Sequence, residues 1–163
     1  GTSIAGSIRV GMHVGAGNQA AVRRSVLVTY TVSIGFMGLC ALLFIGLPEQ
    51  LLRLYTTDPA ILELGTRLLF MAALFQLFDG AQVAGFSVLR GAADTRVPML
   101  LALLAFWGVG GPAAYLLGFQ TGLGPVGVWA GLCLGLAGAA LLLLHRVRRI
   151  LWSGAIVPVA VTA

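Results

Sequence analysis

Asp79 combines an ionisable side chain with an apolar setting. The residues around it, 68–89, form a stretch long enough to cross a bilayer as a helix. A carboxylate near the middle of such a helix costs roughly 2.5–3.5 kcal/mol on insertion scales, and residues kept at this cost usually handle ions, protons or a charged ligand. Gln76 and Gln82 lie one turn to either side of Asp79 on the same helical face. We predict that these three side chains form a cation-coupling or substrate-binding site.

A helix break is the structural alternative for this segment. Asp79 is followed by Gly80, so the carboxylate could cap the second half of an interrupted helix. The two roles can coexist. Aromatic residues near this face would line a cavity in the functional interpretation, and we expect Phe75, Phe86 and Trp107 to do so. Trp107 lies in the middle of the next apolar run, where core packing is an equal alternative.

The composition is that of an integral membrane protein. Hydrophobic residues make up 59% of the chain and charged residues 9%, and the mean hydropathy is +1.00, whereas a soluble domain carries about 25% charged residues. Apolar runs of spanning length cover residues 25–47, 68–89, 98–118 and 126–144. Backbone groups in lipid must be satisfied internally, so these runs must be helices. We therefore predict an all-α membrane protein, a polytopic bundle of four full spans with a truncated helix over residues 1–14.

The connections and spans contain further structural signals. Residues 48–58 are expected to form a short interfacial helix, after which Asp58 caps and Pro59 opens the second span. The third span is expected to break or kink at Gly110, Gly111 and Pro112. A repeated GxxxG stripe in the fourth span predicts the close approach of a neighbouring helix. The stripe consists of Gly127, Gly131 and Gly135.

All ten basic residues are arginines that separate the apolar runs, and residues 145–149 close the last span. Because connections alternate across the membrane, seven arginines fall on one side and two, Arg53 and Arg67, on the other. The seven are Arg23, Arg24, Arg90, Arg96, Arg146, Arg148 and Arg149. By the positive-inside rule this side is cytoplasmic, and the C-terminus with it. The net positive charge thus reflects membrane topology, and no nucleic-acid partner is expected.

Motifs for catalysis or nucleotide binding are missing from the sequence. It contains no phosphate-binding Gly-Lys-Ser/Thr loop, no metal-ligand cluster and no nucleophile–base pair. We therefore expect neither an enzyme nor a bound cofactor or metal. An ion gradient, of H⁺ or Na⁺, is the energy source that remains.

Five stretches of the chain resemble a known transporter family. Residues 75–82 and 89–98 resemble the tenth-helix region of multidrug and toxic compound extrusion (MATE) transporters. Residues 5–17 look like the end of the eighth helix, 107–115 like the eleventh and 124–132 like the entry to the twelfth. The motif residues in the first two stretches are Phe75, Gln76, Asp79, Gly80 and Gln82, then Leu89, Arg90, Gly91, Asp94, Thr95, Arg96 and Pro98. In the other three they include Arg9, Val10 and Gly11, then Trp107, Gly108, Gly110, Pro112 and Tyr115, and then Gly127, Val128, Trp129 and Gly131.

The resemblance implies a twelve-helix antiporter of two six-helix lobes in the cell (inner) membrane, which expels cationic or amphipathic drugs in exchange for H⁺ or Na⁺. Residues 1–149 would be part of its C-terminal lobe, from late helix eight to helix twelve, and residues 150–163 a tail. The family's acidic residue on the tenth helix corresponds to Asp79, and its acidic partner on the seventh would precede Gly1. The implied partners are an organic cation or drug, the N-terminal lobe of the same protein and the lipid bilayer.

Two other functions are alternatives to drug efflux. A lipid-linked oligosaccharide flippase of the same superfamily would share the helix architecture. Such proteins tend to carry a cationic cavity for phosphate, whereas here no arginine lies in the middle of the four spans. The other alternative is a non-transporting membrane module derived from half of a transporter.

Overall fold

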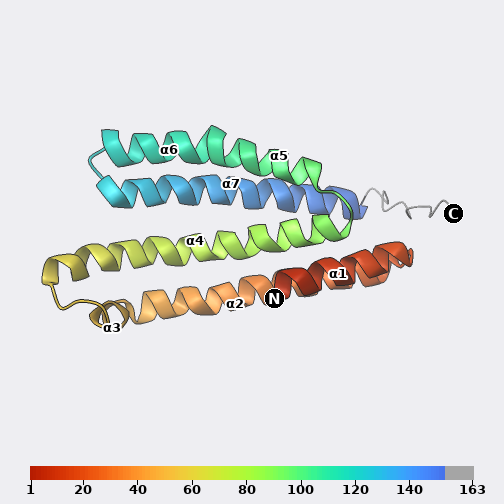
Figure 1. Cartoon of the computed structure of the whole chain (residues 1–163), viewed down its shortest axis with the longest axis horizontal. Coiled ribbons are helices and arrows are strands. Elements are labelled where there is room, and N and C mark those ends of the chain that lie inside the picture. The colour runs from red at the N-terminus through yellow and green to blue at the C-terminus, as the bar shows by residue number, and fades with distance from the viewer. Residues whose placement is uncertain (153–163) are drawn as a thin grey trace.

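The computed structural model describes residues 1–152 and shows an elongated bundle of helices that lie side by side (Figure 1). Residues 153–163, most of the predicted tail, lie outside the described part. The elements are α1 (Thr2–Gly15), α2 (Gln19–Gly46), α3 (Pro48–Arg53), α4 (Pro59–Gly91), α5 (Arg96–Leu104), η1 (Ala105–Gly110), α6 (Gly111–Tyr115), η2 (Leu116–Gln120) and α7 (Gly124–Trp152), where η1 and η2 are π-helical. Four helical units are long and apolar enough to cross a membrane. The predicted all-α polytopic bundle is confirmed.

Side-chain caps fix where two of the spans begin. The Asn18 side chain accepts a hydrogen bond of 3.0 Å from the Ala21 backbone N–H at the start of α2. Asp58 Oδ1 accepts one of 2.9 Å from the Ala60 N–H, and Pro59 occupies the first turn of α4, as predicted. The short helix expected between these spans is also confirmed, as α3. With its cap at Asp58, α4 begins nine residues before the apolar run at Leu68.

Helix α4 is the centre of the bundle. Figure 1 shows it between α2 on one side and α7 on the other, and it also packs against α1. Helix α7 in turn separates α4 from the composite third span, α5 to η2. The middle of α4 therefore has helices on two sides, while Leu74 and Leu77 remain exposed.

The best-packed core lies at the end of the bundle where α1, α2, α4 and α7 meet. It consists of Val10, Val22, Val26, Val88, Leu89, Leu143 and Val147, all nearly inaccessible. Elsewhere, many large apolar side chains are exposed along the helices, among them Leu27, Phe36 and Leu104. In a bilayer such residues contact lipid instead of water, so their exposure fits the spanning role of these helices.

The irregularity predicted near Gly110, Gly111 and Pro112 is present as a π-helical turn and not as a break. The third span is not broken at Gly110–Pro112, because it continues through the π-helical segments η1 and η2. The Gly111 N–H donates to the Phe106 carbonyl, five residues earlier. This wider turn comes directly before Pro112, whose ring and missing N–H are incompatible with a regular α-helical register.

The last span does not end near residue 144. Helix α7 continues through residues 145–149 to Trp152, so the predicted boundary between lobe and tail at residue 150 falls inside a helix. The extension is held by packing and by charge. Val147 is part of the core, and Arg146 Nε donates to Asp94 Oδ2 at 2.9 Å across to the α4–α5 turn.

Candidate functional site

Asp79 lies on an uninterrupted stretch of α4, 20 residues after Pro59 and 12 before Gly91. At 1.5 Å per residue it is about 18 Å from the end of the helix that leads to α5. The Asp79–Gly80 pair does not break the helix, so the capping interpretation is wrong. Asp79 is half-buried, and within residues 1–152 its carboxylate has no hydrogen-bond or ion-pair partner.

Gly80 is explained by the close approach of α2. A Cβ atom at this position would lie 3.0 Å from Met37 Cγ and 3.1 Å from the Ser33 carbonyl oxygen. Helix α2 therefore packs directly beside the residue that follows Asp79. The glycine serves helix packing here, and Asp79 itself lies about 100° around α4 from this contact.

The two predicted amide partners of Asp79 are placed differently from each other. Gln82 is buried, with 7% of its surface exposed. Gln76 is half-buried, and its Oε1 atom is inaccessible without a hydrogen-bond partner among the described residues. A buried amide oxygen that lacks a donor is an acceptor available to a cation or a water molecule.

Helix α2 contributes polar groups that the sequence analysis missed. Ser25, Thr29 and Ser33 are all buried, and the Thr29 hydroxyl donates to the Ser25 carbonyl at 2.8 Å. Ser33 Oγ and the Tyr30 hydroxyl are inaccessible and have no partner in the described chain. The spacing of four between the three small hydroxyl residues places them on one helical face, and this pattern in an uncharged span was the signal that could have revealed them.

Together these residues form what we call the polar seam, namely Tyr30 and Ser33 on α2 with Gln76 and Asp79 on α4. Ser33 lies beside Gly80 and Tyr30 beside Gly85, so the two α2 residues lie along the same length of α4 as Gln76 and Asp79, although Asp79 is on a different side of α4 from the face that meets α2. Oxygen atoms without partners thus cluster along the stretch of α4 that contains the carboxylate. Oxygen is the ligand that hard cations prefer in proteins.

The three aromatic residues expected to line a cavity are spread over the bundle. Phe75 packs edge-on against Trp129 of α7, with ring centroids 5.8 Å apart. Phe86 packs against the core cluster, and Trp107 in η1 is 76% exposed. The structure does not bring the three together, and their part in a cavity stays a prediction.

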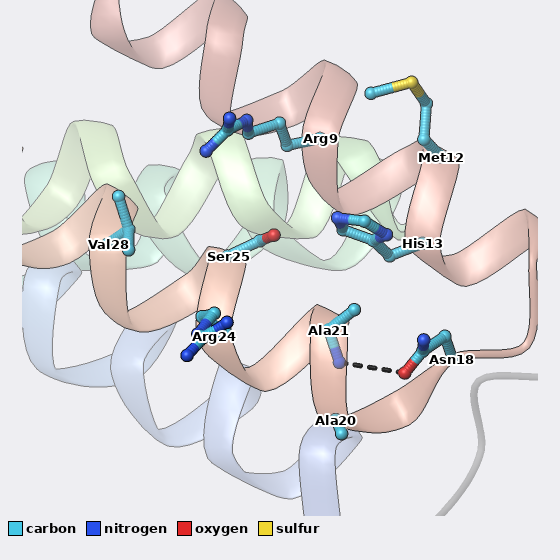
Figure 2. Close-up of a pocket in the computed structure, with 9 residues that line it drawn as sticks. All are labelled: Arg9, Met12, His13, Asn18, Ala20, Ala21, Arg24, Ser25 and Val28. Atoms are coloured by element: carbon cyan, nitrogen blue, oxygen red, sulfur yellow. Dashed lines mark hydrogen bonds between the residues drawn. The ribbon is translucent and has the colours of Figure 1, made fainter.

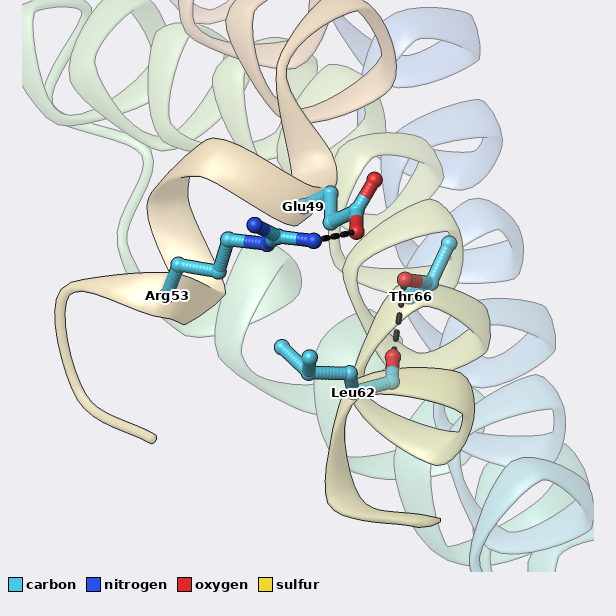
Figure 3. A network of polar contacts seen from close by, with 4 residues as sticks. All are labelled: Glu49, Arg53, Leu62 and Thr66. Carbon is cyan, nitrogen blue, oxygen red and sulfur yellow. Dashed lines mark hydrogen bonds and ion pairs between the residues drawn. The ribbon is translucent and has the colours of Figure 1, made fainter. Parts of the chain in front are cut away.

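The two ends of the bundle differ in charge. At the end that carries α3, Arg53 pairs with Glu49 at 2.6 Å and Arg67 with Glu63 at 2.8 Å. Figure 3 shows the first of these pairs on α3 beside the start of α4. Seven of the other eight arginines flank the helix ends at the opposite end, and among the described residues only Arg146 is paired there. We call this the arginine-rich end.

The sequence matches the model of a known protein family. The model of the MatE family matches residues 1–116. The chain belongs to the MatE family. Similar proteins include the probable multidrug resistance protein NorM of Burkholderia pseudomallei, 43% identical over 150 residues, with 89% of this chain and 32% of the relative covered. The multidrug resistance protein PmpM of Pseudomonas aeruginosa is 40% identical over 147 residues and covers 88% of this chain and 31% of the relative.

Solved structures of MatE-type transporters share the fold. The eukaryotic MATE transporter AtDTX14 superposes with a TM-score of 0.83 at 24% identity, over 90% of this chain and 33% of that one. An inward-facing multidrug resistance MATE transporter of the MOP superfamily gives a TM-score of 0.82 at 17% identity, over 93% of this chain and 35% of that one. The chain spans about a third of the length of the curated relatives it matches. The family resemblance seen in the sequence is confirmed.

Proposed function

We propose that this chain is part of a multidrug efflux antiporter and that Asp79 binds its coupling cation, H⁺ or Na⁺. The observation that carries the proposal is the carboxylate itself, which lies on a spanning helix without an ion-pair partner in residues 1–152. The names of the relatives, which are multidrug resistance proteins, support efflux as the activity.

Ion binding at Asp79 can change the conformation because an unpaired negative charge is unfavourable in an apolar environment. An anionic carboxylate in an apolar contact opposes tight packing, whereas a bound proton or Na⁺ removes most of this opposition. A cationic drug can neutralise the same carboxylate, so ion and drug compete for one group. Competition of this kind makes the exit of one depend on the entry of the other, which is exchange.

The partners follow from this mechanism. Because the chain covers about a third of its relatives, we infer that further helices of the same protein complete the pathway for an organic cation. The unpaired oxygen of Gln76, one turn before Asp79 on the same side of α4, would help to coordinate the coupling ion or a water molecule next to Asp79. Relatives named for drug resistance give the flippase alternative no comparable support.

An Asp79→Asn variant of the full-length transporter tests the coupling role. Asparagine keeps the shape of the side chain but cannot take up a proton or a charge, so we expect loss of drug resistance at normal abundance in the membrane. Asp58→Asn makes the same chemical change at the exposed cap of α4 and should leave resistance intact, because asparagine also caps helices. Undiminished efflux by Asp79→Asn would contradict the proposal.

We also propose that the arginine-rich end faces the cytoplasm, in the cell membrane. Seven arginines flank this end and two, Arg53 and Arg67, flank the opposite end, and the positive-inside rule, which counts basic residues, favours the arginine-rich end. A fluorescent protein fused to the C-terminus should fluoresce, and alkaline phosphatase fused there should be inactive. The reverse pattern would invert the proposed topology.

A further inference from the structure

A polar cavity of about 750 Å³ opens between α1 and α2 at the arginine-rich end of the bundle. Arg9, Met12 and His13 line it from α1, and Arg24, Ser25 and Val28 line it from α2. Figure 2 shows the His13 ring and the Ser25 hydroxyl directed into the space between the two helices. The volume is within the range of about 300–1,000 Å³ that is usual for binding sites of small ligands.

The charges around this cavity are unopposed. Arg9 and Arg24 are exposed, and neither has an ion-pair partner within the described chain. Asp94, an acidic side chain at the same end of the bundle, is paired with Arg146. Two guanidinium groups with a neighbouring imidazole and hydroxyl match the oxygens of a phosphate group, which arginine can bind in a bidentate manner.

The remaining lining of the cavity is apolar. Met12 is 59% exposed and Val28 44% exposed, and both face a space that also contains the charged groups. A free phosphate ion would gain nothing from these two side chains. A phospholipid would place its headgroup on the arginines and the start of an acyl chain on Met12 and Val28.

The depth of the cavity agrees with this ligand. Arg24 lies within the first two turns of α2, and Arg9 lies in the last two turns of α1, so both are close to the level where lipid headgroups meet a spanning helix. Basic pockets between transmembrane helices at this level bind anionic headgroups. We propose that the cavity between α1 and α2 binds the phosphate group of an anionic phospholipid through Arg9 and Arg24, with His13 and Ser25 as further hydrogen-bonding groups.

The test is native mass spectrometry of the purified protein in detergent, titrated with phosphatidylglycerol. We expect one lipid bound with higher affinity than the rest, and a loss of affinity of about tenfold or more for this lipid in the double variant Arg9→Gln/Arg24→Gln. The matched control is Arg23→Gln/Arg96→Gln, which removes two exposed arginines at the same end but outside the cavity. It should keep the tight lipid. Equal weakening in both double variants would overturn the site, since it would show only general surface charge.

Two further experiments distinguish the binding of lipid from that of free phosphate, and a lost site from a misfolded protein. Inorganic phosphate should displace the tight lipid only at concentrations far above that of the lipid, and phosphate binding as tight as that of phosphatidylglycerol would overturn the lipid assignment. Arg9→Lys/Arg24→Lys keeps the charges but loses the bidentate geometry, so it should bind more weakly than the parent protein and more tightly than the glutamine variant. A lysine variant as weak as the glutamine variant, with unchanged circular dichroism, would contradict the contribution of charge to the site. None of these measurements depends on transport or on Asp79.

Discussion

Two helix contacts in this bundle are built in opposite ways. Between α7 and the third span, small residues bring the backbones together. Along α2 and α4, the polar seam contains hydroxyl, amide and carboxylate groups, and three of its buried polar atoms have no partner in the described chain. The contact between α7 and the third span leaves no room for a ligand. The polar seam contains hydroxyl and amide oxygens that have no hydrogen-bond partner among the described residues.

The contact of α7 with the third span, which we call the glycine seam, consists of Gly127, Gly131 and Gly135. A Cβ atom at these positions would lie 2.1 Å from the Leu117 carbonyl oxygen, 2.1 Å from the Ala114 nitrogen and 2.7 Å from the Gly110 Cα, respectively. All three obstacles are backbone atoms, which cannot rotate away. The packing role predicted for the GxxxG stripe is therefore confirmed.

The two helix contacts differ in their effect on stability. Buried polar groups without partners destabilise a protein by about 1–3 kcal/mol each, so a contact that keeps several of them gives up stability. A contact made of glycines carries no such cost and fixes two helices closely. The glycine seam thus acts as scaffold, and the polar seam contains the carboxylate to which we assign the binding of the coupling ion.

The largest effect should follow from Gly131→Ala. The new methyl group would have to displace the backbone of Ala114, and overpacking of this kind costs about 1–3 kcal/mol or more. We expect a clearly lower melting temperature in detergent. Gly108→Ala in η1 of the neighbouring third span is the control, because nothing lies within 4 Å of the added Cβ atom. A Gly131→Ala protein as stable as the Gly108→Ala protein would show that the glycine seam is not rigid.

We expect Gln76→Leu in the polar seam to stabilise the protein, in contrast to Gly131→Ala. Leucine has a similar volume and removes a buried acceptor that has no partner within residues 1–152, so the free energy of unfolding should rise by about 1 kcal/mol. Drug efflux by the full-length transporter should fall, since the ion site loses an oxygen. Gln120→Leu at the exposed end of η2 is the matched control and should change neither quantity. A stabilised variant with full efflux would limit the polar seam to a structural role.

The sequence was sufficient for features that depend on residue type and spacing alone. Apolar run length predicted the spans, the Asp58–Pro59 pair predicted the start of α4, and glycine spacing predicted the tight contact of α7. These signals are local, so they do not depend on which helix lies next to which.

What the sequence did not predict depends on neighbours in space. Gly80 looked like a break because the approach of Met37 cannot be read from α4 alone. The extension of α7 past residue 144 rests on the pairing of Arg146 with Asp94, 52 residues earlier. Tyr30 and Ser33 were missed because an ordinary hydroxyl in a span becomes informative only when its neighbours leave it without a partner.

The smallest effect should come from Gly80→Ala, and it makes the comparison of the two seams quantitative. Here the added Cβ atom would lie 3.0 Å from Met37 Cγ and 3.1 Å from the Ser33 carbonyl oxygen, so α2 and α4 have to move apart by only a few tenths of an ångström to relieve the contact. Alanine also gains about 1 kcal/mol over glycine in a helix interior. The two terms nearly cancel, and we expect a melting temperature close to that of the parent protein. If Gly80→Ala were as damaging as Gly131→Ala, the polar seam would be as rigid as the glycine seam. Helix α4 would then be fixed against α2, and coupling would have to act through other helices of the transporter.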